Sequence, residues 1–299
     1  MKVFLIGASG YIGGSVAAGL LSAGHHVLGL VRSAQKAGQV QALGIDPVLG
    51  TLDDGDILMR AARDADAVIN AADADHMAAI EAILPALAGS GKAFIQTSGS
   101  SIVGDRAWGE PGDKVYEDET PFQPGPGRAA RVAVNQRVLA AAADGVRAVV
   151  VSPSLIYGTG RGAHRESIQI PRLVALAKKF GVARHVGRGE NIWSNVHIDD
   201  LSDLYLRILA HAPAGAAYFA ENGEHSMRQV CAAISRALGY DGSTQAMSMD
   251  EAIAEFGEGA ASYTYGSNSR VRATRARREL AWSPRYDSLL ETIERELAP

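Results

Sequence analysis

Three glycines with regular spacing stand near the N-terminus, in Gly7-Ala8-Ser9-Gly10-Tyr11-Ile12-Gly13. They separate a short apolar segment, 2–6, from a segment with helically spaced apolar residues, 11–23. In a strand–turn–helix context, such glycines permit the tight turn, the approach of a pyrophosphate and close helix–strand packing. The helix N-terminus adds free amides and a positive dipole. The pattern therefore predicts a dinucleotide site that includes Gly7, Ser9, Gly10, Tyr11 and Ile12; the alternative is a glycine turn without a ligand.

The end of the second predicted strand, 27–31, bears on which dinucleotide binds. Enzymes that use NAD commonly place Asp or Glu there to bind the ribose 2′-hydroxyl. This chain has Arg32-Ser33 instead. Because a guanidinium can pair with a 2′-phosphate, we expect NADP(H) rather than NAD(H). The alternative is an exposed arginine that contacts no ligand.

Alternating strand and helix patterns must position these residues. The predicted strands are 2–6, 27–31, 46–49, 67–70, 93–97 and 146–151, and the predicted helices between them are 11–23, 33–43, 54–63, 75–88 and 128–143. Repeated βαβ units with continuous apolar strands indicate a parallel sheet with helices on both faces. We expect a Rossmann-like, doubly wound α/β fold with a smaller, mostly helical C-terminal substrate region.

The predicted boundary between the two parts is not clean. Residues 1–155 form the expected NADP-binding domain, to which 192–212 returns, and 156–299 form the expected substrate-binding region. Segment 98–127 interrupts the alternation with six glycines and four prolines. A long loop of this kind in a compact domain is usually functional.

Composition excludes several other classes of protein. The 299 residues include 29 basic and 33 acidic side chains, for a net charge of −4, so nucleic acid is not an expected partner. The single cysteine, Cys231, excludes a disulfide within the chain. No apolar run approaches the roughly 18 residues that span a bilayer, so no membrane partner is expected. We expect a soluble, cytoplasmic protein.

Four motifs together resemble the extended short-chain dehydrogenase/reductase superfamily, which includes nucleotide-sugar epimerases, dehydratases and dihydroflavonol-type reductases. They are the glycine pattern 7–13, Val68-Ile69-Asn70-Ala71-Ala72, Pro153-Ser154-Leu155-Ile156-Tyr157-Gly158 and Val196-His197-Ile198-Asp199-Asp200-Leu201. The resemblance covers nearly the whole chain. It implies further cofactor contacts from Leu52, Ala71, Ala72, Thr97, Pro153 and Ile156, and substrate contacts from Tyr157, His164, Arg165 and Trp193. Because relatives are often dimers, it also implies a homodimer.

By the same resemblance, a catalytic Ser or Thr follows the fifth strand, within Thr97-Ser98-Gly99-Ser100. Ser100 fits that position best and Ser98 second. A hydroxyl there can donate a hydrogen bond to a substrate carbonyl and stabilise developing negative charge. The alternative is that these small residues only form a loop.

The superfamily also places Tyr-x-x-x-Lys at the start of the long helix, where tyrosine donates a proton and lysine lowers its pKa. No tyrosine in this chain has lysine four residues later. Gly127 stands where the tyrosine is expected, and Arg131 stands where the lysine is expected. Glycine cannot donate a proton, whereas Arg131 can keep the positive charge and the ribose contact. Tyr116, Tyr157 and His164 are weaker candidates for a replacement acid.

The leading hypothesis is an NADPH-dependent reductase that transfers hydride to a carbonyl, or less favourably an imine, of a small organic molecule. Ser100 would polarise the carbonyl and Arg131 would hold the nicotinamide ribose. The proton would come from water, a relay or an acidic group of the substrate. One alternative is a catalytically silent NADP(H)-binding redox sensor. The other is a nucleotide-sugar epimerase or dehydratase with an unrecognised base.

Three remaining clusters have structural interpretations. His197 with Asp199 and Asp200 suggests a metal site, but no second cluster supports one, so we expect no metal and expect Asp199 to cap the following helix. Cys231 lies in an apolar helical pattern and is expected to be buried and inert. The arginine-rich segment 270–278 is expected to form ion pairs or a solvated helix face.

Overall fold

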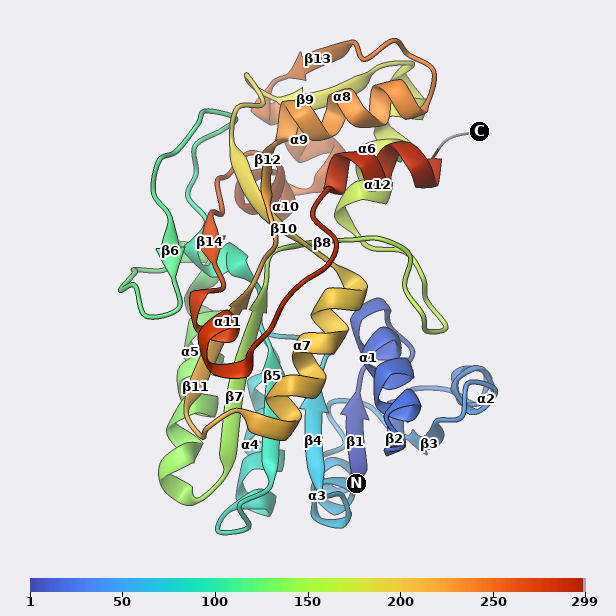
Figure 1. The fold of residues 1–299 in the computed structure, drawn as a ribbon, viewed down its shortest axis with the longest axis vertical. Helices are drawn as coiled ribbons and strands as arrows, with labels where there is room; N and C mark the ends of the chain where they lie inside the picture. Colours follow the sequence, from blue (N-terminus) through green and yellow to red (C-terminus); the bar gives the residue numbers. More distant parts are fainter. Residues whose placement is uncertain (298–299) are drawn as a thin grey trace.

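Seven parallel strands form the central sheet in a computed structural model that describes residues 1–297, in the order β11-β7-β5-β4-β1-β2-β3 (Figure 1). Their bounds are β1 Lys2–Ile6, β2 His26–Val31, β3 Asp46–Leu49, β4 Ala67–Asn70, β5 Ala93–Thr97, β7 Arg147–Pro153 and β11 Ala216–Ala220. The predicted doubly wound α/β fold is confirmed, and the six predicted strands are present. The seventh strand, β11, was not predicted.

Helices cover both faces of this sheet because side chains alternate along each strand. Val3 and Leu5 of β1 join the core on one face, and Phe4 and Ile6 join the core on the other. The first face is covered by α1 Tyr11–Ser22, α2 Ala34–Gln41, α7 Ile198–His211 and α11 Thr274–Leu280; the second by α3 Gly55–Asp64, α4 Met77–Leu87 and α5 Ala129–Ala140. The sheet is therefore buried on both sides.

The C-terminal half returns to this sheet over a longer stretch than 192–212. β11 pairs with β7, and Trp282, which follows α11, is buried in the same core as α1 and α7. The indole of Trp282 donates to the carbonyl oxygen of Asp200 at 3.0 Å. Arg147 of β7 also donates to the last carbonyls of α7, those of Ile208 and Leu209 among them. These contacts seat α7 beside α1.

A second core holds the C-terminal region together, in the upper part of Figure 1. Its elements are α6 Gln169–Phe180, β9 Ala183–Val186, α8 Met227–Ala237, β13 Thr244–Met247, α9 Met249–Phe256, α10 Glu258–Ala260 and α12 Leu289–Leu297. Cys231 of α8 is buried in this core, as predicted, and burial raises the pKa of its thiol to about 12. Among residues 1–297, no helix has the length and apolar character needed to cross a membrane.

Small sheets connect the two regions. One has the order β12-β10-β8, with bounds β8 Leu155–Tyr157, β10 Ile192–His197 and β12 Glu224–Ser226; another pairs β14 Val271–Arg272 with β6 Tyr116–Glu117. The β14–β6 pair ties the long loop 98–127 to the arginine-rich segment. That segment forms the predicted ion pairs: Arg270 and Arg272 bind Glu224, Arg277 binds Glu221, and Arg275 and Arg278 bind Glu279.

Candidate active site

The glycine turn lies in the crevice between β1 and β4, where the strand order of the sheet reverses. Gly7 has φ +90°, and a Cβ atom on it would lie 2.8 Å from the carbonyl carbon of Ala71. A Cβ atom on Gly13 would collide with the carbonyl oxygen of Gly7. The amide of Gly10 donates to that same oxygen at 2.9 Å, which closes the turn. The backbone therefore forms a side-chain-free cradle at the α1 N-terminus, which fits a dinucleotide pyrophosphate.

A cavity of about 640 Å³ extends from this turn toward the C-terminal region. Most of its wall comes from six segments that are far apart in the sequence: the glycine turn, the end of β4, the start of the long loop, the start of α5, the β7–β8 connection and the loop before α6. They contribute Gly10, Tyr11, Ile12, Ala71, Ala72, Ser98, Gly99, Ser100, Ser101, Arg128, Arg131, Pro153, Ser154, Ile156, His164, Glu166, Ser167, Ile168 and Gln169, with Trp193, Gly259, Ala260 and Thr264 closing the far side.

The two candidate serines line this cavity but differ in where their hydroxyl protons go. Ser98 Oγ accepts a hydrogen bond from Asn135 Nδ2 of α5 at 2.8 Å, and its own proton has no partner among the described residues. Ser100 Oγ lies 2.8 Å from Ser269 Oγ, and Ser269 donates its proton to the Ser100 carbonyl oxygen at 2.9 Å. Ser100 must therefore donate its proton to Ser269. Of these two serines, therefore, only Ser98 keeps a hydroxyl proton without an acceptor among the described residues.

Arg131, in the first turn of α5, lies where sequence analysis placed it, at the cavity wall. Its Nε and Nη2 atoms donate to the two carboxylate oxygens of Asp75 at 2.8 and 2.7 Å. This bidentate pair lowers the pKa of Asp75, and burial only partly opposes the effect. Nη1 of Arg131 lies 3.7 Å from the position of a Cβ atom on Gly99. One edge of the guanidinium is thus held by Asp75, and the other faces the serine loop.

The space next to Gly127 is filled by a tyrosine from a distant segment. The amide of Gly127 donates to the phenolic oxygen of Tyr263 at 3.2 Å. A Cβ atom on Gly127 would lie 2.8 Å from Cε2 of the same ring. The guanidinium of Arg128 stacks on that ring, with its Cζ 4.8 Å from the ring centroid. Tyr263 is buried, and the cavity walls include Arg128 but not Tyr263.

The structure separates several predicted residues from the cavity. The hydroxyl of Tyr157 donates to the carbonyl oxygen of Tyr286, and Tyr157 and Arg165 line a neighbouring hollow instead. Thr97 is buried, with its hydroxyl 2.6 Å from that of Tyr205, and Leu52 packs on the core beneath α3 and α4. Tyr157 and Arg165, two of the expected substrate contacts, therefore lie outside the wall of this cavity. His164 and Trp193 do line the cavity.

Arg32 and Ser33 lie at the end of β2, outside this cavity. Arg32 is exposed and has no ion-pair partner among the described residues. The hydroxyl of Ser33 accepts from the amide of Lys36 at 3.3 Å and so caps α2. The guanidinium is therefore available to a ligand. Tyr116, proposed as a weak candidate acid, lies in β6 and packs edge-on against Phe122.

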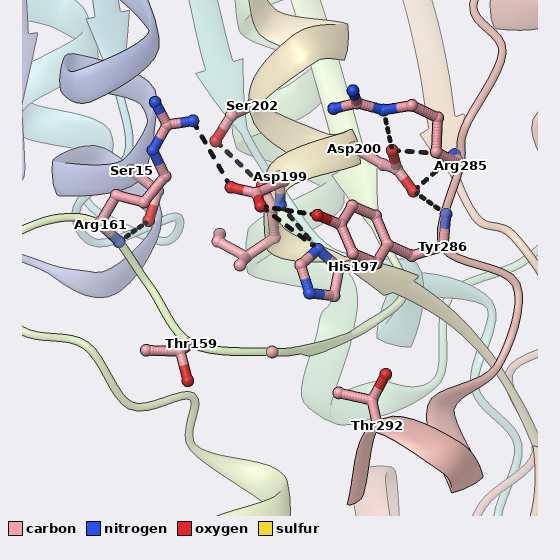
Figure 2. A network of polar contacts seen from close by, with 12 residues as sticks. Ser15, Thr159, Arg161, His197, Asp199, Asp200, Ser202, Arg285, Tyr286 and Thr292 are labelled. Carbon is pink, nitrogen blue, oxygen red and sulfur yellow. Dashed lines mark hydrogen bonds and ion pairs between the residues drawn. The ribbon is translucent and has the colours of Figure 1, made fainter. Parts of the chain in front are cut away.

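The His197 cluster is structural, with one correction (Figure 2). The cap of α7 is His197 rather than Asp199, because Nδ1 of His197 accepts from the Asp199 amide at 3.1 Å. His197 stacks on Tyr286 with ring centroids 3.6 Å apart, and burial lowers its pKa. Asp199 instead faces Arg161 at 3.6 Å, and Asp200 accepts from the amides of Arg285 and Tyr286. Over residues 1–297, no three His, Cys, Asp or Glu side chains gather as metal ligands.

Four residues of the site were missed by sequence reasoning. Asp75 and Asn135 lie inside predicted helical segments, where nothing marks them as partners of Arg131 and Ser98. Arg128 directly follows the position where a tyrosine is expected, and this proximity could have identified it as a residue of the site. Tyr263 is 136 residues from Gly127 in the chain, and no local pattern links the two.

Comparisons with known proteins agree with this architecture. The family model "NAD dependent epimerase/dehydratase family" matches residues 3–220. The chain is 35% identical to "Oxidase ucsJ" of Acremonium sp, over 98% of this chain and 95% of that protein. It is 31% identical to a 4-hydroxy-2-methyl-3-oxo-4-farnesyl-3,4-dihydroquinoline-1-oxide ketoreductase of Stigmatella aurantiaca, over 75% of this chain and 69% of that protein.

The fold is similar to that of a dTDP-glucose 4,6-dehydratase of Bacillus anthracis solved with NAD, with a TM-score of 0.78, 18% identity and coverage of 98% of this chain and 96% of that one. That likeness concerns the fold alone. The family match extends from the glycine turn to β11 and so includes the cradle and most of the cavity walls. The chain therefore belongs to the NAD-dependent epimerase/dehydratase family.

Proposed function

We propose that the protein is an NADPH-dependent reductase of a carbonyl group in a small organic molecule. The observation that carries the proposal is the free hydroxyl proton of Ser98. This proton lies in the same cavity as the glycine turn and Arg131. The similarity to a ketoreductase supports reduction as the direction of the reaction.

The residues present fit a nicotinamide dinucleotide. Gly7, Gly10 and the α1 N-terminus would hold the pyrophosphate, Arg131 the nicotinamide ribose, and Arg32 a ribose 2′-phosphate. Ala71, Ala72, Pro153 and Ile156 would supply apolar walls beside the rings. When bound in its reduced form, such a cofactor supplies a hydride.

Ser98 is the residue that would polarise the substrate carbonyl. Asn135 fixes the position of Ser98 Oγ and leaves its proton free to donate to the carbonyl oxygen. This donation stabilises the negative charge that develops on the oxygen during reduction. Ser100 cannot donate in the same way while its proton is held by Ser269. The structure thus favours Ser98 over Ser100, the reverse of the order that sequence position suggested.

The proton that completes the alcohol does not come from the usual tyrosine. Tyr11 lines the cavity, but its hydroxyl donates to the carbonyl oxygen of Gly158 at 2.7 Å, and burial raises its pKa. His164 is exposed at the cavity wall, where it can relay a proton from solvent. Solvent through His164, or an acidic group of the substrate, remains the source in this proposal.

Oxidation of NADPH by the purified protein tests the proposal, with ketones, aldehydes, diketones and quinones as substrates and NADH in parallel. Turnover with a preference for NADPH, lost in Ser98→Ala, is the expected result. Turnover that favours NADH overturns the role of Arg32. Tight NADPH binding with no turnover on any compound would favour the redox sensor. Oxidation or epimerisation of a nucleotide sugar would favour the third hypothesis.

A further inference from the structure

One cation at the cavity wall, Arg128, has no anionic partner in direct contact among the described residues. Arg128 makes no side-chain hydrogen bond or ion pair with any of residues 1–297, and its Nε atom is buried without a partner. Burial lowers the pKa of this guanidinium and the charge of Arg131 lowers it further, whereas the carboxylate of Asp75, which is paired with Arg131, acts in the opposite direction. A guanidinium nevertheless stays protonated in proteins. The guanidinium is half-buried and its Nε atom is fully buried, and a polar group that leaves water without a hydrogen-bond partner is costly, so the site favours a ligand that brings negative charge.

The neighbouring arginines do not share this property. Arg131 is neutralised by the bidentate carboxylate of Asp75. Arg106 also lies over the Tyr263 ring, with its Cζ 5.4 Å from the centroid, but its guanidinium faces Glu258 at 3.8 Å and does not line the cavity. The other titratable groups at the cavity wall are Tyr11, whose hydroxyl donates to Gly158, and His164 and Glu166, which are exposed on the loop before α6.

Tyr263 explains why the Arg128 guanidinium can stay in place without a protein acceptor. The ring supplies a stacking surface for the cation, and the Gly127 amide fixes the phenolic oxygen. A side chain at position 127 would displace this ring, because a Cβ atom there already contacts it. Glycine at 127, Tyr263 and Arg128 thus form one unit, in which the planar donor edge of the guanidinium remains open to a ligand.

We propose that Arg128 binds a carboxylate of the substrate, so that the reductase acts on oxo acids. The proposal rests on the proposed function, because it assigns the substrate class of the same cavity. A guanidinium and a carboxylate form two parallel charge-assisted hydrogen bonds. These bonds fix the orientation of the bound molecule and also strengthen its binding. The carboxylate itself is unchanged: the ketone gains a hydride and a proton, and NADPH leaves as NADP⁺.

Binding of a non-reducible product analogue tests Arg128 without depending on turnover. Calorimetric titration of the NADPH-loaded protein compares 3-hydroxydecanoate with its methyl ester, a pair that differs in the negative charge. We expect the acid to bind about 10- to 100-fold more tightly than the ester, the effect of a hydrogen-bonded charge pair. Arg128→Gln should remove this difference, Arg128→Lys should restore part of it, and Arg106→Gln, the matched control on the same ring, should keep it.

Turnover of 3-oxodecanoate supplies a second readout. Because the carboxylate contact is made equally before and during reduction, Arg128→Gln should raise KM and leave kcat nearly unchanged. Equal binding of acid and ester, no binding of the acid, or a preference that survives Arg128→Gln would overturn the proposal. So would binding of uridine diphosphate in place of the acid. Acid-selective binding without reduction of any oxo compound would instead retain the anion site and refute the reductase.

Discussion

The backbone amide of Gly127 donates a hydrogen bond to the phenolic oxygen of Tyr263 at 3.2 Å, and the tyrosine ring occupies the space that a side chain at position 127 would need. Gly127, which stands where sequence analysis expects the family tyrosine, therefore does not leave an empty space. It is a contact surface for a ring that supports Arg128. A tyrosine introduced at 127 would collide with the Tyr263 ring.

The first prediction concerns this contact. Gly127→Tyr and Gly127→Ala should each lower the free energy of unfolding by about 1–3 kcal/mol, because the added atoms overpack against Tyr263. Gly127→Tyr should also fail to raise kcat. Urea denaturation and steady-state kinetics measure both effects. Gly38→Ala in α2, where a Cβ atom meets nothing within 4 Å, is the control and should not destabilise the protein. A higher kcat in Gly127→Tyr at unchanged stability would contradict the packing argument.

The second prediction separates the two serines. Ser98→Ala should lower kcat by about 10²- to 10³-fold with little change in stability, as expected for loss of one donor to a developing oxyanion. Ser100→Ala should mainly lower the melting temperature, since it leaves Ser269 Oγ without its donor. Steady-state kinetics and thermal denaturation of both variants show which serine acts in catalysis and which stabilises the fold. Loss of activity in Ser100→Ala alone would restore the order that sequence position suggested.

The third prediction concerns the Arg131–Asp75 pair. Arg131→Ala should weaken NADPH binding by about 10-fold, because a charged contact to the ribose is lost. Fluorescence titration of NADPH measures this. Arg137→Ala is the matched control: Arg137 lies on the same helix and forms a similar two-pronged pair with Glu81, away from the cavity. Unchanged NADPH affinity and turnover in Arg131→Ala would refute the proposed role.

The fourth prediction concerns the choice of cofactor. Arg32→Asp should reduce the preference for NADPH over NADH by about 10- to 100-fold, because a carboxylate repels a 2′-phosphate and accepts a hydrogen bond from a 2′-hydroxyl. The ratio of kcat/KM for the two cofactors is the measurement, and Lys36→Ala, one helical turn away, tests whether any nearby cation suffices. If Arg32→Asp leaves the ratio of kcat/KM for the two cofactors unchanged, residues other than Arg32 bind the 2′-phosphate.

The fifth prediction uses Glu224, which lies between Arg270 and Arg272. Burial alone would raise the pKa of this carboxyl, but hydrogen bonds from both arginines outweigh burial and lower the pKa to about 2. A carboxyl with a lowered pKa in the folded state stabilises the protein above its unfolded pKa, near 4.5, and loses this effect as the pH falls toward 2.

Glu224→Gln should therefore cost roughly 1–2 kcal/mol at pH 7, less than the shift alone implies because solvent screens the pair. The difference from the unaltered protein should shrink between pH 4.5 and pH 2. Urea denaturation at several pH values checks this. A constant difference across that range would mean that packing, not charge, is what the substitution removes.

Sequence alone determined the central fold because its signals are local. Apolar β-branched runs, helical spacing and the glycine turn at 7–13 depend on neighbours in the chain, and they located β1 to β5, β7 and the cradle. The same local reading missed β11, because strand Ala216–Ala220 is recognisable only by its pairing with β7 across a long insertion. It also named His164, Trp193 and Arg131 as wall residues, since each follows a predicted element or family motif.

Tertiary structure alone decided which of these groups are chemically free. Sequence position ranked Ser100 above Ser98, but in the folded chain Asn135 leaves the Ser98 proton available while Ser269, 169 residues away from Ser100, accepts the Ser100 proton. Likewise, Asp75 neutralises Arg131, and Tyr263 supports Arg128 without neutralising it. The reason is physical: a hydrogen bond or ion pair depends on which atoms lie within about 3 Å, and only the folded chain sets those distances.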